Sequence, residues 1–128
     1  MDEISQLKEV LALEKKIWTK DGMKLFAELS ENMISILKTI LTKSPDNCSA
    51  LINLGAIYSN LGRHEEAKEI LTKAKDLHAD DKNLFLNLGY VSINLREPKH
   101  IVTAYLQMAK DKEAGKYTFE AYFDPMAH

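Results

Sequence analysis

The 128-residue sequence has little of what several protein classes require. Its single cysteine excludes an internal disulfide and fits a reducing, cytoplasmic setting. Five glycines and three prolines are too few for many short strands and tight turns. With 17 basic and 19 acidic residues, the net charge is −2, without the positive excess typical of nucleic-acid binders. No apolar run approaches the roughly 18 residues that span a bilayer, so we expect no membrane insertion.

Apolar residues recur at three- and four-residue steps along almost the whole chain, as they do on one face of a helix. No segment alternates with a period of two for long enough to indicate a strand. The sequence therefore predicts an all-α protein. The expected helices lie within residues 2–21, 25–43, 48–61, 66–77, 84–95 and 98–115. Gly22 is expected to end the first of them in the left-handed conformation, and Met108 is expected to face inward in the last.

The chain resembles itself at a regular spacing along the sequence. The tripeptide Asn53-Leu54-Gly55 recurs as Asn87-Leu88-Gly89, and 87 − 53 = 34 gives the period. The pattern Ala67-x3-Leu71-x2-Ala74 aligns at the same spacing with Ile101-x3-Tyr105-x2-Met108. A period of this length is typical of a helix–turn–helix unit that buries its apolar face by stacking on its neighbours.

These motifs resemble the tetratricopeptide repeat family. The resemblance implies one domain over 1–128, a right-handed helical-repeat solenoid (α-α superhelix) of about three units with a C-terminal capping segment. The Gly and Ala positions would lie where the two helices of a unit cross closely. The parts would be an atypical N-terminal helix pair over 1–47, a clear repeat over 48–81, a degenerate repeat over 82–115 and an aromatic tail or capping helix over 116–128.

In this family the first helix of each unit lines a concave groove, so the resemblance implies an interaction module that binds a peptide or protein segment. The carboxamides of Asn53 and Asn87 would form two rungs that hold the N–H and C=O groups of an extended backbone. A generic role in the fold is the alternative for both asparagines. The positions expected to face the groove are Ile52, Asn53, Ala56, Asn60, Asn83, Leu86, Asn87, Tyr90 and Asn94.

Aromatic residues are concentrated in the tail. One hypothesis is a short capping helix that ends at Pro125, with three of the aromatics on one side. Another is a segment that docks into a groove, either its own, as autoinhibition, or that of a neighbouring copy; disorder is the third. A homo-oligomer assembled through the solenoid ends and this tail is the alternative function. The candidates for self-association are Trp18, Tyr117, Phe119, Tyr122 and Phe123.

The sequence contains no recognisable catalytic or cofactor-binding pattern. None of the four histidines belongs to a set of three metal ligands at helical spacing. Glycine is too sparse for a phosphate-binding loop. Cys48 has no histidine near it in sequence, although its place at a helix start would lower its thiol pKa. We therefore expect no enzyme, no metal and no cofactor, and a protein or peptide as the partner.

Overall fold

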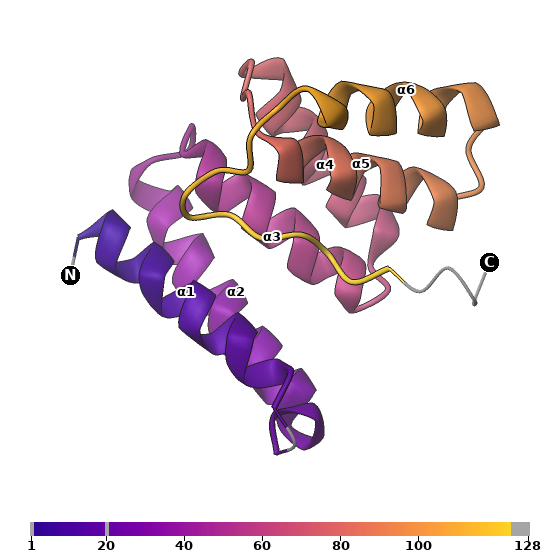
Figure 1. Cartoon of the computed structure of the whole chain (residues 1–128). Coiled ribbons are helices and arrows are strands. Elements are labelled where there is room, and N and C mark those ends of the chain that lie inside the picture. The colour runs from indigo at the N-terminus through magenta and orange to yellow at the C-terminus, as the bar shows by residue number, and fades with distance from the viewer. Residues whose placement is uncertain (1, 20, 124–128) are drawn as a thin grey trace.

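The computed structural model describes residues 2–19 and 21–123, and the described chain folds into helices followed by an extended tail (Figure 1). No strand occurs in these ranges, so the all-α prediction is confirmed. No helix among the described residues combines the length and apolar character that a membrane span requires. The elements are α1 (Glu3–Ile17), the 3-10 helix η1 (Gly22–Leu25), α2 (Phe26–Lys43), α3 (Cys48–Asn60), α4 (His64–Asp76), α5 (Lys82–Asn94) and α6 (Lys99–Lys110).

Consecutive helices pack on one another along the whole described array. The pairs are α1 with α2, α3 with α4, and α5 with α6, and α2 packs on α3 as α4 packs on α5. The first helices of the second and third pairs, α3 and α5, are also in contact. This arrangement is a helical-repeat solenoid, as predicted, in which α3 and α5 form adjoining walls.

Side-chain caps fix where the first helices of the repeats begin. The backbone N–H of Ala50 donates to Asn47 Oδ1 over 3.0 Å, so Asn47 is the N-cap of α3. The backbone N–H of Asn83 donates to Asp81 Oδ1 over 2.8 Å at the start of α5. The two caps are separated by one repeat period, and they give α3 and α5 the same register in their repeats.

A glycine lies at the crossing of each repeat's two helices. A Cβ on Gly55 would lie 2.4 Å from Leu71 Cγ, and a Cβ on Gly89 would lie 2.6 Å from Leu106 Cδ2. The close approach expected at these glycines is therefore present. However, the side chain nearest to this Cβ on Gly89 is that of Leu106. The alignment of the two repeats had made Tyr105, and not Leu106, the counterpart of Leu71.

The second helix of the last repeat is thus displaced by one residue. Helix α5 begins one repeat period after α3, whereas α6 begins at Lys99, one position later than one period after His64 at the start of α4. One extra residue in the turn before α6 accounts for the difference. The prediction that Met108 faces inward was wrong: Met108 is 44% exposed, and Ala109, one position later, is 2% exposed.

The first helix is shorter than predicted and ends at Ile17. Gly22 does not take the left-handed conformation that was expected of it, since Gly62 is the described glycine with a positive φ. Its role is instead a close approach: a Cβ there would lie 1.7 Å from the carbonyl oxygen of Lys16. A glycine is therefore needed where the chain turns from α1 into η1.

The tail is not a capping helix. Residues 111–123 contain no helix, and residues 118–123 are extended and lie across α3 (Figure 1). The helical prediction failed here because the tail's backbone N–H groups donate to side-chain amides of other helices instead of to carbonyls one turn back. The predicted stop at Pro125 lies outside the described residues.

Candidate peptide-binding groove

The tail occupies the groove between α3 and α5 and runs in the same direction as both helices. Tyr117 lies at Asn53, near the start of α3, and Tyr122 lies at Asn60, its last residue. The walls of this groove are α3 and α5, the neighbouring first helices of the array. The peptide it holds belongs to the chain itself.

Two buried asparagines hold the tail by its backbone. Asn53 Nδ2 donates to the carbonyl oxygen of Tyr117 over 2.8 Å, and its Oδ1 accepts from the N–H of Phe119 over 3.1 Å. Asn87 repeats this geometry two residues further along the tail, with 3.2 Å to the carbonyl of Phe119 and 2.7 Å to the N–H of Ala121. Each carboxamide therefore pairs with one C=O and one N–H, as an adjacent β-strand would.

Both asparagines are completely buried beneath the tail, with 0% exposure. A third asparagine continues the row, because Asn60 Oδ1 accepts from the N–H of Tyr122 over 2.7 Å. These five hydrogen bonds involve only backbone atoms of the tail, so they fix an extended conformation without selecting side chains. That the two rungs hold the backbone of a partner stays a prediction, since the backbone they hold here belongs to the chain's own tail.

A polar cluster fixes the start of the docked segment. The hydroxyl of Thr118 donates to Asp81 Oδ2 over 2.9 Å and accepts from Asn83 Nδ2 over 3.0 Å. The N–H of Gly115 donates to Asp81 Oδ1 over 3.0 Å. A Cβ on Gly115 would lie 2.1 Å from Asp81 Oδ2, so the chain can approach this carboxylate only as glycine. Asp81 therefore caps α5 and anchors the tail at the same time.

The other tail side chains divide into buried and exposed positions. Phe119 is 8% exposed and Ala121 is 3% exposed, and both belong to the hydrophobic core. Glu120 lies between them, is exposed, and accepts a hydrogen bond from the hydroxyl of Tyr90. Burial raises the pKa of Tyr90, and the hydrogen bond to the Glu120 carboxylate raises this pKa further. The rings of Tyr90 and Phe123 stack, with centroids 4.9 Å apart and 5° between their planes.

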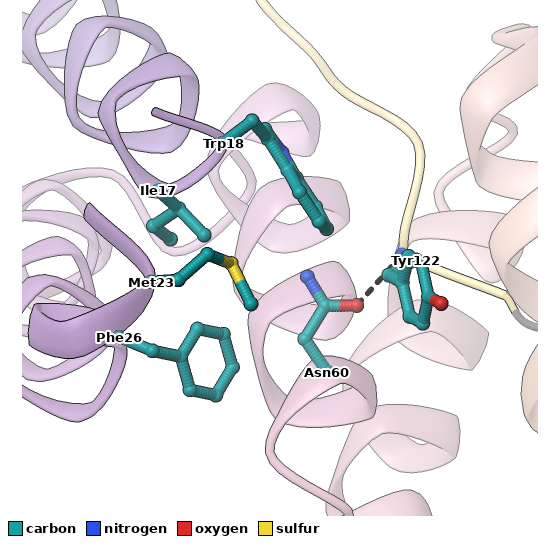
Figure 2. Close-up of a pocket in the computed structure, with 6 residues that line it drawn as sticks. All are labelled: Ile17, Trp18, Met23, Phe26, Asn60 and Tyr122. Atoms are coloured by element: carbon teal, nitrogen blue, oxygen red, sulfur yellow. Dashed lines mark hydrogen bonds between the residues drawn. The ribbon is translucent and has the colours of Figure 1, made fainter. Parts of the chain in front are cut away.

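An apolar cavity of about 230 Å³ adjoins the C-terminal end of the docked tail. Figure 2 shows residues from the α1 end and the start of α2 on one side, and Asn60 and the tail on the other. The rings of Trp18 and Tyr122 lie 5.5 Å apart, and both residues remain about half exposed. The lining residues are Ile17, Trp18, Met23, Phe26, Asn60 and Tyr122.

The predicted groove residues separate into three groups. Five of them hydrogen-bond the tail: Asn53, Asn60, Asn83, Asn87 and Tyr90. Ile52 and Ala56 are buried in the core, and Leu86 packs partly buried against it. Asn94 makes no hydrogen bond to residues 113–122 of the described tail. Four residues that contact or form the docked tail were not predicted from the sequence, because an aspartate before a helix is explained by capping alone: Asp81, Thr118, Gly115 and Ala121.

The described contacts of the self-association candidates lie within the chain itself. Trp18 faces Tyr122, Phe123 stacks on Tyr90, and Phe119 is buried in the groove. The linker that leads to the tail is held at the start of α5, because the N–H of Lys82 donates to the carbonyl of Glu113 over 3.0 Å. Assembly between copies stays a prediction, and these contacts describe a tail that docks in its own groove.

Other candidate chemistry is sparse in the described part of the chain. Within residues 2–19 and 21–123, no three His, Cys, Asp or Glu side chains gather closely enough to hold a metal ion. Burial, together with the negative charge of Asp46, raises the pKa of the Cys48 thiol. The expectation that the helix start would lower this pKa was wrong, because desolvation outweighs the helix dipole at this half-buried position.

Comparison with known proteins gives two matches. Residues 34–88 match the family model described as Tetratricopeptide repeat, which covers the end of α2, the α3–α4 pair and the start of α5. The chain is also similar to the Protein CTR9 homolog of Arabidopsis thaliana, with 40% identity over 55 residues, 43% of this chain. The matched segment spans only 5% of that protein. No solved structure matches the chain.

Proposed function

We propose that the chain belongs to the tetratricopeptide repeat family through residues 34–88. On this premise it is an interaction module whose α3–α5 groove binds an extended segment of a partner protein. Tetratricopeptide repeats in general mediate contacts between proteins and are not catalytic. In this chain the site is the asparagine-lined groove, the ligand is a peptide, and no reaction is catalysed.

One observation carries the proposal, which is the pairing of Asn53 and Asn87 with both edges of peptide groups in the tail. A buried carboxamide with an unpaired N–H and C=O is costly, about 1–3 kcal/mol for each unsatisfied group. The two rungs therefore favour whichever extended backbone lies in the groove. The tail satisfies them in the isolated chain, and a partner segment satisfies them when it takes the tail's place.

The expected partner is a protein and not a nucleic acid, because the chain has a net charge of −2 and nucleic-acid binders usually carry a positive excess. We place the protein in the cytoplasm, because its single cysteine suits a reducing compartment.

The test is binding of a peptide in trans to the 128-residue chain with its own tail loosened. Ala121→Arg provides this host, because a long charged side chain does not fit at a position that is 3% exposed. The probe is a fluorescein-labelled peptide of residues 113–123, and binding is measured by fluorescence anisotropy. We expect the host to bind the probe, and the wild-type chain to bind it at least about tenfold more weakly because the tethered tail competes.

Removal of the two rungs provides the decisive comparison. Asn53→Ala and Asn87→Ala, introduced together into the host, should reduce probe affinity by at least about tenfold with unchanged helical circular dichroism. The matched control is Asn32→Ala, since Asn32 is exposed on α2 away from the tail. Equal binding by the host with and without the rungs would place the peptide site elsewhere and refute the proposal.

A further inference from the structure

The groove contacts side chains of the docked tail as well as its backbone. We propose that the partner segment carries the pattern of residues 118–122, namely a hydroxyl residue, an aromatic residue, any residue, a small residue and an aromatic residue, and that it binds by replacing 117–122 between α3 and α5. This inference rests on the proposed function, because it names the ligand class of the same site.

The hydroxyl position is the most selective. Thr118, Asp81 and Asn83 are each no more than 8% exposed, and the Thr118 hydroxyl satisfies a carboxylate oxygen and an amide N–H at once. A valine of almost the same shape would leave both groups buried without a partner. Sites built around a hydrogen-bonding group reject analogues that lack it far more strongly than apolar pockets reject a missing methylene. The segment therefore requires serine or threonine here.

The next positions are selected by size. Phe119 inserts into the core between the two asparagine rungs and is 8% exposed. Ala121, whose N–H donates to Asn87, is 3% exposed, so a larger side chain would lift the backbone off this rung. An aromatic residue is favoured at the first position because it buries a large apolar area, and a small residue is required two positions later.

The remaining positions are less restrictive. Glu120 is exposed, and its carboxylate meets the Tyr90 hydroxyl at the rim of the groove, so many residues are tolerated there. Tyr122 donates its N–H to Asn60, and its ring lies against Trp18 at the apolar cavity. An aromatic ring gains contact area at this place, while its half-exposed edge carries little selectivity.

The test uses the 128-residue Ala121→Arg host and a series of peptides of residues 113–123 that differ at one position. The unmodified peptide and the Thr118→Ser peptide should bind within about threefold of each other. The Thr118→Val and Ala121→Leu peptides should bind at least about tenfold more weakly. The Glu120→Gln peptide is the matched control at an exposed position and should bind within about threefold of the unmodified peptide.

Fluorescence of Trp18 gives a second readout, because it is the chain's single tryptophan and lies beside Tyr122. Addition of the unmodified peptide to the Ala121→Arg host should change this emission at the concentrations at which anisotropy shows binding, because the peptide supplies the tyrosine ring that the loosened tail no longer holds beside Trp18. A second host, Phe119→Ala, is used if Ala121→Arg lowers the helical signal. Unfolding of both hosts would show that the tail is an inseparable part of the core and would overturn the proposal.

The outcomes separate this inference from the function on which it rests. If the Thr118→Val and Ala121→Leu peptides bind as tightly as the unmodified one, and the asparagine rungs are still required, the groove recognises only the peptide backbone. In that case the side-chain pattern is overturned and the proposed function stands. If a folded host binds no peptide of the series, both the inference and the proposed function are overturned.

Discussion

The docking of the tail should depend on Asn87 by an amount that follows from its two hydrogen bonds. Asn87→Ala removes the acceptor of the Ala121 N–H and the donor to the Phe119 carbonyl. A net contribution of about 0.5–1.5 kcal/mol for each bond gives about 1–3 kcal/mol. The ratio of docked to undocked tail should therefore fall by about 5- to 150-fold, since about 1.4 kcal/mol is a factor of ten.

Amide hydrogen exchange measured by NMR can follow this change residue by residue. The N–H of Ala121 should lose protection because its acceptor is gone. The N–H of Phe119 is the sharper probe, because it donates to Asn53, which the substitution leaves intact. If the tail leaves the groove as one unit, protection at Phe119 falls together with that at Ala121, while amides within α3 and α4 keep theirs.

Two results would refute this reasoning. Unchanged protection at Phe119 would mean that the rungs act one by one and that the tail does not undock cooperatively. A loss of protection throughout α3 and α5, with a lower melting temperature, would mean that Asn87 serves the fold of the repeat and not the tail. Asn32→Ala on the exposed side of α2 controls for the effect of removing any asparagine.

Three further predictions concern the scaffold. Gly55→Ala should lower stability by about 1–3 kcal/mol in chemical denaturation, because the new Cβ would lie 2.4 Å from the buried Leu71 Cγ; an unchanged midpoint would contradict the close crossing. Arg96→Gly should raise stability by up to about 1 kcal/mol, because Arg96 has a φ of 58° in the left-handed region, and Gly62 takes this conformation at the same position of the preceding repeat. A fall in stability would show that contacts of the arginine side chain outweigh the backbone strain. Hydrogen bonds from Ser44 and Asn47 lower the pKa of Glu3, so the stability that the ionised Glu3 contributes is complete above the carboxyl pKa of the unfolded chain and is lost as the pH falls through the lower folded value. The difference in melting temperature between wild type and Glu3→Gln should therefore shrink in acid. A difference that stays constant with pH would contradict this.

The sequence predicted the helices because they depend on local periodicity. Apolar spacing indicated six helices, and the recurrence of Asn53 as Asn87 one period later placed two carboxamides on matching faces of α3 and α5. The extra residue before α6 was missed for a physical reason. Ile101 and Val102, like Met108 and Ala109, are neighbours that can each face inward, so the pattern fits two registers, and packing against Gly89 selects one of them.

The tail's conformation was beyond sequence reasoning because its aromatic spacing fits two structures. Phe119, Tyr122 and Phe123 would share one side of a helix, yet in the extended tail Phe119 is buried while Tyr122 is half exposed. What decides between the two is the supply of hydrogen-bond partners outside the segment. The asparagine rungs, which lie far from the tail in sequence on α3 and α5, provide those partners, and a local pattern contains no information about them.

If the tail and a partner segment make the same backbone contacts, the asparagine rungs cannot decide which of them occupies the groove. A segment tethered by a short linker competes at an effective concentration of about millimolar, so a partner needs contacts that the tail lacks. The apolar cavity beside Trp18 offers them, because Met23 on its wall is 56% exposed and Tyr122 only borders the space. Met23→Ala should therefore weaken a partner segment that reaches this cavity, while hydrogen-exchange protection of the Phe119 and Ala121 amides in the isolated chain, which reports tail docking, stays the same. Equal losses of partner binding and tail docking would instead show that the cavity serves the tail itself.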